Sequence, residues 1–479
     1  MLPGVTVVDD LIEPWIDRRL VGTGFIYEFI LMRDFADTCL QVYFSETFSD
    51  MDFIIVNAGL YSLFGDYSHH VPSEEKHAHL GHADTCLANL ETTLSSLPLH
   101  LPATSDAVTA LRFGAWHAIE LSKPYLSWAL SNKGSEQCQT LNYHRMPDTD
   151  NGDDAKFKKF LFWTNYFLDK SLSLRLGRAS TIPNWDITTH RPLTNDPCKE
   201  PGMAYYVLWV ESARCQGNIY QLLYSPEAVS QPGHVRSTRA QLLVDNLRTL
   251  EGATQETDKK WMQISKDNAG KDLMDFFATS DGILRLSLLT LVLRAAPQPA
   301  GAPTTFSPSC TEAARATLHR HQDCMAIIEK SSEGFLPTYV HWTLLFAPFI
   351  PFIVVFCQVL HGVAARYVGL SARYGDGQPQ DTEDRGMYLR LFCALSPGES
   401  SGSDQHRQGP AHDLGGGEFA QGVDVEGIST TSEEHAAPML MNPMMRMSHG
   451  AQLEEWFYSN QALMESFQTF SHGFPTAEG

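Results

Sequence analysis

Apolar residues recur at helical spacing along most of the chain, and strand-like alternation is hard to find. In residues 105–132 they follow a Ser-Asp start at three- and four-residue steps, which predicts a helix that Pro124 kinks. Residues 155–176 carry a broad apolar face and stop at Gly177, the residue type that most often follows a helix end. The same pattern predicts amphipathic helices at 203–225, 236–265, 271–296 and 308–330. The sequence therefore predicts an all-α protein of about ten helices.

One segment is apolar enough to resemble a membrane span. Residues 343–360 contain no charged side chain, and a helix of that length would reach about 27 Å, near the thickness of a bilayer core. Pro348 and Pro351 interrupt the helical hydrogen bonds inside it, and no second uncharged segment of this kind is found in the sequence. We therefore interpret it as a buried core helix that continues to Tyr367, with a membrane anchor as the alternative.

The composition changes sharply near residue 396. Residues 396–438 are rich in Gly, Ser and acidic residues and almost lack large apolar side chains, so the region 396–450 is expected to form a disordered linker. An amphipathic pattern returns in residues 451–470, where an apolar face could dock onto the main body. The predicted organisation is a helical domain over 1–395, a linker over 396–450 and a C-terminal helix within 451–470.

The charge balance argues against direct nucleic-acid binding by this chain. With 35 basic and 56 acidic residues the net charge is −21, whereas phosphate backbones are bound through clustered Lys and Arg. The best basic cluster, formed by Lys156, Lys158 and Lys159, is short and fits the solvated start of a helix. We therefore expect any contact with DNA to be indirect or to come from another module.

The cysteines indicate a reducing compartment and no metal cluster. Nine are scattered through the chain without a C-x-x-C pair, so no zinc or thioredoxin-type site is predicted. The odd number, the absence of an N-x-[ST] sequon and the lack of a signal peptide at the start of the sequence favour the cell interior.

Catalytic motifs are weak or absent. Residues 398–402 fit the G-x-S-x-G nucleophile pattern around Ser400, but they lie in the predicted linker without the strand and helix that such a serine requires. Five histidines could suggest a metal site, although their spacing suits helical ligation poorly: His69, His70, His77, His79 and His82. We assign no catalytic, cofactor-binding or metal residue and expect no enzymatic activity. The alternative is an intracellular helical enzyme or small-molecule-binding protein without a recognisable motif.

Two arginines at the end of the 155–176 helix raise a choice between an anion site and a structural brace. Arg175 and Arg178 flank Leu176 and Gly177, and a cation at a helix C-terminus favourably meets the negative end of the helix dipole. A nearby Asp169 and Asp186 could complete a partly buried ion-pair network. We therefore expect a structural motif that braces the helix against the following loop.

This stretch resembles the core motif of the fungal-specific transcription factor domain, the middle homology region of fungal zinc-cluster regulators. The matching positions are Phe162, Trp163, Tyr166, Asp169, Ser171, Leu174, Arg175, Leu176, Gly177, Arg178, Ile182, Asp186 and Ile187. Other segments agree in the same order, from LPGVTVVDDLIEPWID at the start through FLPTYVHWTLLFAPFIPFIVVFC to LEEWFYSNQALM near the end. The similarity covers most of the chain to about residue 368 and the last helix.

The resemblance implies an all-helical regulatory domain of a nuclear regulator of RNA polymerase II transcription. Members of the family often control metabolic or secondary-metabolite gene clusters. They normally carry an N-terminal cluster of six cysteines that binds two zinc ions and contacts DNA, and this sequence contains no such cluster. The resemblance therefore implies DNA contact indirectly or through a missing N-terminal module, a homodimer or other transcription factors as partners, no membrane, and no cofactor held by this chain.

Overall fold

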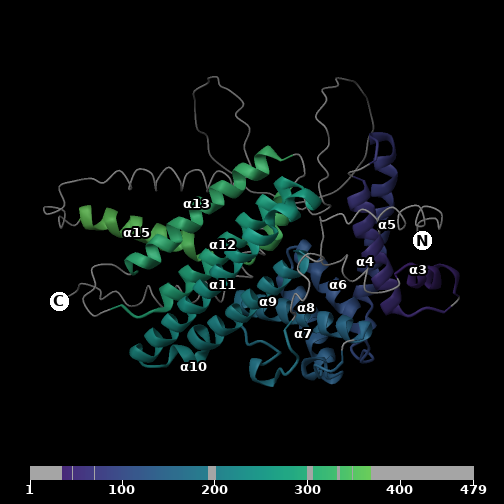
Figure 1. Ribbon diagram of the computed structural model, residues 1–479, viewed down its shortest axis with the longest axis horizontal. Coiled ribbons are helices and arrows are strands. Elements are labelled where there is room, and N and C mark those ends of the chain that lie inside the picture. The colour runs from purple at the N-terminus through teal and green to yellow at the C-terminus, as the bar shows by residue number, and fades with distance from the viewer. Residues whose placement is uncertain are drawn as a thin grey trace, which may run out of the picture. The chain divides into compact units, whose positions relative to one another are not determined.

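The computed structural model describes residues 35–45, 47–68, 71–150, 152–191, 201–298, 306–331, 335–347 and 349–367. These residues form helices joined by turns and contain no β-strand (Figure 1). The helices are α3 (Phe35–Phe44), α4 (Asp50–Tyr67), α5 (Ser73–Ser95), α6 (Ser105–Glu120), α7 (Pro124–Thr140), α8 (Asp153–Leu176), α9 (Pro201–Ile219), α10 (Pro226–Val229), α11 (Gly233–Ala269), α12 (Lys271–Ala295), α13 (Pro308–Lys330), α14 (Leu336–Thr338) and α15 (Ile350–Tyr367). The predicted all-α fold is confirmed.

Short elements of other geometry join several of these helices. Single 3₁₀ turns occur at Tyr143–Arg145 and Asn184–Asp186. π-Helical turns follow α9 at Tyr220–Tyr224 and α14 at Tyr339–Leu344. The described residues all belong to one unit of the chain. The linker expected over 396–450 and the helix expected within 451–470 lie outside the described residues.

Helices that follow one another in sequence pack together as hairpins. The pairs α4–α5, α6–α7, α8–α9 and α12–α13 are all in contact, and α11 packs on both α9 and α12. Figure 1 shows α9, α11 and α12 as neighbouring, roughly aligned rods. Helix α8 contacts α6, α7 and α9, and most of its residues are buried, so it lies in the interior of the described part of the chain.

The sequence of α8 accounts for its central place. From Phe160 onward its side chains are mostly apolar or small, and each residue from Leu168 to Leu176 is buried. Phe160, Trp163 and Tyr166 pack their rings with neighbouring aromatic side chains. A helix that is apolar all round is stable only when other elements cover it. The largest core cluster is therefore built around α8, with α4 and α6 as its other main contributors.

A second apolar cluster connects α8 to a distant part of the chain. Leu168 and Leu172 of α8 pack with Ile119 of α6 and with Leu345 and Phe346, which follow the π-helical turn. The turn itself supplies Tyr339 to a third cluster with α12 and α13. The segment 339–347 thus joins the half of the fold that contains α8 to the half that contains α12.

Two glycines allow other helices to come close to α8. A Cβ atom added at Gly134 of α7 would lie 2.6 Å from Oδ1 of Asn165, and one added at Gly217 of α9 would lie 2.6 Å from Cδ of Lys170. Real side chains do not approach so closely, so both helices depend on glycine at these contacts.

The expected single helix over 105–132 is wrong. The structure has two helices, because Pro124 begins α7 instead of kinking a continuous helix. Proline lacks the N–H that a helix interior needs, and it fits the first helical position well. Ser122, with a φ of 52°, lies in the turn between the two helices.

The apolar segment 343–360 is not one continuous helix. It begins in the π-helical turn that ends at Leu344, and α15 starts only at Ile350. Among the described residues one helix, α12, is long and apolar enough to cross a membrane by length and composition, and 56% of its most apolar window is buried within the protein. Core helices of folded proteins meet the same criteria.

Candidate functional site

Asp169 holds the loop that follows α8. Its side chain is fully buried. One carboxylate oxygen accepts a hydrogen bond from the backbone N–H of Thr181 at 2.8 Å, and the other accepts from the N–H of Ile182 at 3.2 Å and from the hydroxyl of Ser180. Backbone donors that are buried need such partners. The three bonds therefore fix residues 180–182 against the helix.

Lys170 binds the same loop from the neighbouring position of α8. Its Nζ donates to Oγ of Ser180 at 2.6 Å and to the carbonyl of Ile182, and it lies 5.1 Å from the ring centre of Tyr166. Burial lowers the pKa of this ammonium to about 8, although the negative charge of Asp169 acts in the opposite direction. Asp169 and Lys170 together form a buried polar network at the centre of an apolar core.

Arg175 ties the end of α8 to the 339–347 segment. The side chain is buried, its Nη1 donates to the carbonyl of Leu345, and its guanidinium lies 5.8 Å from the ring centre of Phe346. Burial lowers the pKa of Arg175 to about 9. In this structure Arg175 thus contacts protein groups that are 170 residues away in the sequence.

Gly177 ends α8 in the left-handed region, with φ 63° and ψ 37°. Its N–H donates to the carbonyl of Leu174 at 3.2 Å, and the N–H of Arg178 donates to that of Ser173 at 2.9 Å. This pair of bonds is the Schellman motif, which glycine favours because it lacks a Cβ atom. The helix end predicted at Gly177 is confirmed.

Arg178 takes a different position from the expected buried brace. Its side chain is exposed, and its guanidinium lies 4.4 Å from the ring centre of Trp128 and 5.1 Å from that of Tyr125. Both aromatic residues belong to α7. Arg178 therefore stacks on the outside of α7 through cation–π contacts.

Asp186 also has partners other than those expected. It pairs with Arg145 and lies 3.5 Å from Nε2 of His144, both in the 3₁₀ turn before α8. The predicted ion pairs of Arg175 or Arg178 with Asp169 and Asp186 are wrong. Each carboxylate instead fastens a different part of the loop, Asp169 its start and Asp186 its middle.

We expect Gly177→Ala to lower the free energy of unfolding by about 1–2 kcal/mol, because an L-residue with a Cβ atom is disfavoured in the left-handed region. Urea titration followed by circular dichroism measures the loss. Gly252→Ala is the matched control, since an added methyl group at this position of α11 meets nothing within 4 Å. That change should stabilise the protein by up to about 1 kcal/mol, and equal effects of the two substitutions would contradict the assigned cap.

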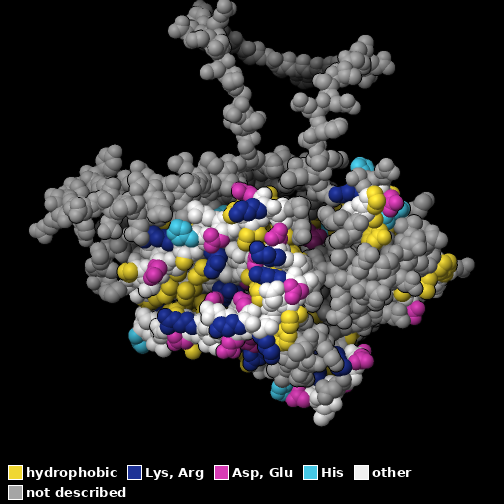
Figure 2. Space-filling view, turned by 45° about the horizontal axis from the view of Figure 1, so that its top comes forward, with side chains coloured by type: hydrophobic (Ala, Val, Ile, Leu, Met, Phe, Trp, Pro, Cys, Tyr) yellow, Lys and Arg dark blue, Asp and Glu magenta, His cyan; other side chains and the backbone are white. Residues whose placement is uncertain are grey.

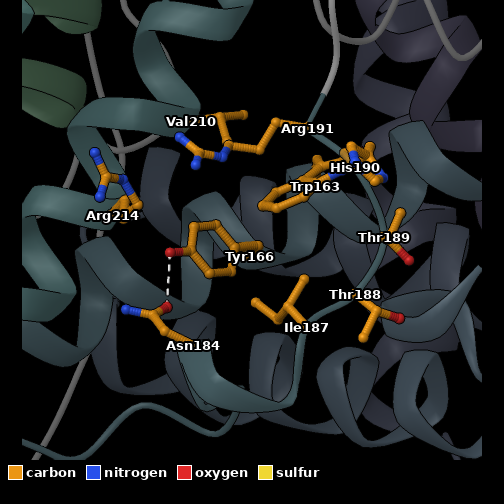
Figure 3. A pocket seen from close by; sticks show the side chains of 10 residues that line it. All are labelled: Trp163, Tyr166, Asn184, Ile187, Thr188, Thr189, His190, Arg191, Val210 and Arg214. Atoms are coloured by element: carbon orange, nitrogen blue, oxygen red, sulfur yellow. Dashed lines mark hydrogen bonds between the residues drawn. The ribbon is translucent and has the colours of Figure 1, made fainter.

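A pocket of about 270 Å³ opens beside this braced loop (Figure 3). Three elements form its walls: α8, α9 and the segment 184–191. The lining residues are Trp163, Tyr166, Asn184, Ile187, Thr188, Thr189, His190, Arg191, Val210 and Arg214. Figure 3 shows Tyr166 at the centre of the view, with Arg191 and Arg214 on the side of α9.

The polar groups around the pocket are ordered by hydrogen bonds. The Tyr166 hydroxyl donates to Oδ1 of Asn184 at 2.8 Å, and the Asn184 amide donates to Asn218 of α9 at 3.0 Å. The indole N–H of Trp163 donates to the carbonyl of His190 at 3.0 Å. Burial raises the pKa of Tyr166, so its phenol stays neutral. These bonds hold both aromatic rings in place at the pocket wall.

Two arginines share one carboxylate at the pocket. Glu211 of α9 pairs with Arg191 and accepts a hydrogen bond from Nε of Arg214 at 2.9 Å. Burial works against the charged form of Arg214, but the charge and hydrogen bond of Glu211 outweigh it and raise the pKa of Arg214. This group of three side chains carries a net positive charge.

The histidine cluster contacts aromatic rings. His77, His79 and His82 lie on α5, whereas His69 and His70 are outside the described residues. His79 packs against the edge of Tyr67, with ring centres 5.1 Å apart, and His82 packs on Phe64 at 5.2 Å. Within the part of the chain that the structure describes, no group of three or more His, Cys, Asp or Glu side chains is placed to share a metal ion. Ser400 lies outside the described residues.

Sequence reasoning missed Lys170 and the pocket. Lysine is usually an exposed residue type, and only the place of Lys170 directly after Asp169 hints at a buried pair. Arg191 and Arg214 are 23 positions apart in the sequence, and the packing of α9 on α8 brings them together. The sequence contained no local pattern from which this pair could be found.

Two fungal regulators are similar to this chain. An uncharacterised transcriptional regulatory protein of Schizosaccharomyces pombe is 24% identical over 301 residues, which cover 59% of this chain and 46% of that protein. The lactose regulatory protein LAC9 of Kluyveromyces lactis is 29% identical over 116 residues, which cover 24% of this chain and 13% of that protein. The chain thus spans less than half the length of each relative. No family model matches the chain, and no solved structure matches it.

Proposed function

We propose that this chain is a regulatory part of a fungal transcription regulator. The observation that carries the proposal is the similarity to the Schizosaccharomyces pombe regulatory protein over 301 residues. LAC9, a second protein named as a regulator, supports the same class. An all-helical body with a central braced helix suits a domain that positions partners and responds to signals.

The finer points of the proposal concern how such a chain would act. The net charge of −21 and the absence of a zinc-cluster pattern from this sequence favour DNA contact through a separate zinc-binding module or a partner protein. We further propose a nuclear location, control of RNA polymerase II transcription of metabolic or secondary-metabolite genes, and a homodimer or other transcription factors as partners. A fluorescent fusion that stays outside the nucleus would contradict the proposed location.

A tethering experiment tests the regulatory function. The full chain is fused to an unrelated DNA-binding domain in yeast, and transcription is measured from a reporter that carries the matching site. We expect a several-fold change relative to the DNA-binding domain alone, upward for an activating part and downward for a repressing one. An unchanged reporter at equal protein level would overturn the proposal.

A pair of substitutions on α8 controls for the folded state. Asp169→Ala removes the buried carboxylate that anchors the loop, and it should abolish the reporter effect. Asp153→Ala changes an exposed residue at the start of the same helix, and it should leave the effect intact. The comparison shows whether the effect requires the folded domain.

A further inference from the structure

The pocket beside α8 has an apolar part and a cationic part. Its apolar lining consists of Ile187, which is partly exposed, and of Val210, Trp163 and Tyr166, which are almost fully buried and form its floor. The cationic part consists of Arg191 and Arg214 (Figure 3). A pocket of this composition distinguishes ligands by both shape and charge, because its apolar surface favours a carbon skeleton and its arginines favour an anionic group.

The two arginines have hydrogen-bond donors and positive charge that Glu211 does not use, so they can bind a further anion. Arg214 binds Glu211 through Nε, and in the part of the chain that the structure describes neither Nη atom of Arg214 has a hydrogen bond to a protein group. Glu211 cancels only one of the two positive charges. The planar guanidinium presents paired donors that match the two oxygens of a carboxylate. A carboxylate at this place would restore local neutrality.

The size of the pocket limits the ligand. Pockets for drug-sized molecules have volumes of about 300–1,000 Å³, and this pocket, at about 270 Å³, is slightly smaller. Tyr166 already donates its hydroxyl proton to Asn184, so it has no proton left to donate to the hydroxyl groups of a polar ligand. A compact, flat acid fits these limits better than a nucleotide or a sugar phosphate.

We propose that this pocket binds a small aromatic carboxylic acid, with the carboxylate on Arg214 and Arg191 and the ring packed on the partly exposed side chain of Ile187, above the buried floor. The role of such a ligand as a regulatory signal rests on the proposed function. Since α8, α9 and the segment 184–191 all line the pocket, a bound ligand would hold α9 and this segment together. Ligand binding would thereby be coupled to the stability of the interface between α8 and α9.

Benzoate is the probe for this proposal. Isothermal titration and saturation-transfer NMR on the full chain near neutral pH should detect its binding, whereas benzyl alcohol, which has the ring without the charge, should bind much more weakly. Arg214→Gln should weaken benzoate binding by about 10-fold or more, the expected loss of a charge-assisted contact. Arg248→Gln changes an exposed arginine on α11 that pairs with Asp245, and it should have no effect.

A second substitution, which is expected to strengthen benzoate binding instead of weakening it, makes the test specific. Glu211→Gln removes the carboxylate that competes for both arginines, so it should tighten benzoate binding by about 2–5-fold. If Glu211 served only to hold the two arginines in place, its replacement would weaken benzoate binding instead. No binding of benzoate, equal binding of benzyl alcohol, or competition by inorganic phosphate that is equal to that of benzoate would each overturn the proposal.

The outcomes separate this inference from the proposed function. A chain that changes reporter transcription but does not bind benzoate would leave the regulatory function standing and remove the pocket assignment. A chain that binds benzoate through Arg214 but leaves the reporter unchanged would do the reverse. Addition of benzoate to the reporter strain then tests whether the two properties are coupled.

Discussion

Replacement of Asp169 by Ala is expected to lower the free energy of unfolding by about 3–5 kcal/mol, the range observed when one partner of a buried charged network is removed. The carboxylate satisfies the N–H groups of Thr181 and Ile182 and the hydroxyl of Ser180. Its loss would also leave the buried Lys170 ammonium without the neighbouring negative charge that favours its protonated form. Urea titration followed by circular dichroism measures the change.

Two further variants distinguish the charge from the hydrogen bonds. Asp169→Asn keeps one acceptor oxygen and the size of the side chain, so it should cost less than Asp169→Ala. Asp153→Ala, on the exposed first turn of the same helix, should leave the stability almost unchanged, because an exposed ion pair contributes little. A loss below about 1 kcal/mol for Asp169→Ala would show that the network does not hold the loop.

The sequence predicted best those helices whose ends carry local information. Residues 308–330 match α13, because Ser307 caps the helix and Pro308 occupies its first turn. Residues 155–176 match α8, whose end at Gly177 is set by a Schellman motif. These features depend on neighbouring residues alone, so they can be read without knowledge of the tertiary structure.

Helix α4 is harder to predict from the sequence, because a helix that is buried on most sides lacks the alternation of apolar and polar faces. Helix α4 is apolar on most sides, since α5 and α6 both pack on it, and a helix covered in this way has no polar face to reveal its period. At the break between α6 and α7 the sequence predicts a kink instead of a helix end. At this position the sequence showed a proline, and only the structure showed the positive φ of Ser122 that separates the two helices.

For the candidate site, the sequence identified Asp169, Arg175, Gly177, Arg178 and Asp186, but it missed Lys170, the pocket and most of the partners of these residues. The sequence predicts that the motif from Asp169 to Asp186 braces the helix end, and in the structure Asp169 and Arg175 bind the following loop and the 339–347 segment, whereas Arg178 is exposed. The bonds of this motif run to backbone groups, to Leu345 and to Arg145, and not between the arginines and aspartates of the motif itself. A prediction of ion pairs from closeness in sequence takes no account of the direction of side chains on a helix or of the long-range contacts of the fold.

Acidification is expected to destabilise the protein through two buried histidines. Burial lowers the pKa of His321 to about 4 and that of His341 to about 4, below the value of about 6.5 for an unfolded chain. As the pH falls through about 6.5, the unfolded chain binds protons that the folded protein does not, so stability is lost as pH decreases. At pH 5 each histidine should cost about 2 kcal/mol relative to pH 7, or about 4 kcal/mol together.

The geometry at His321 explains why the folded protein resists this proton. Nδ1 of His321 contacts the hydroxyl of Tyr339, which is fully buried in the π-helical turn, and the two rings are stacked 5.5 Å apart. The hydroxyl can donate to Nδ1 only while the imidazole is neutral. Protonation would therefore remove a buried hydrogen bond and place a charge in the apolar cluster that joins 339–347 to α12 and α13.

Urea titrations at pH 7 and pH 5 measure the effect as a difference in unfolding free energy. His321→Gln should reduce this difference by about 2 kcal/mol, because glutamine does not titrate, and His341→Gln should reduce it by a similar amount. His234→Gln, on the exposed side of α11, is the control and should leave the difference unchanged. Each variant is compared with itself at the two pH values, so a general loss of stability caused by the substitution cancels. If the difference in unfolding free energy between pH 7 and pH 5 is unaltered in both buried variants, His321 and His341 do not cause the acid sensitivity. The buried His117 and His144, whose pKa values are also lowered chiefly by burial, would then be the next groups to test.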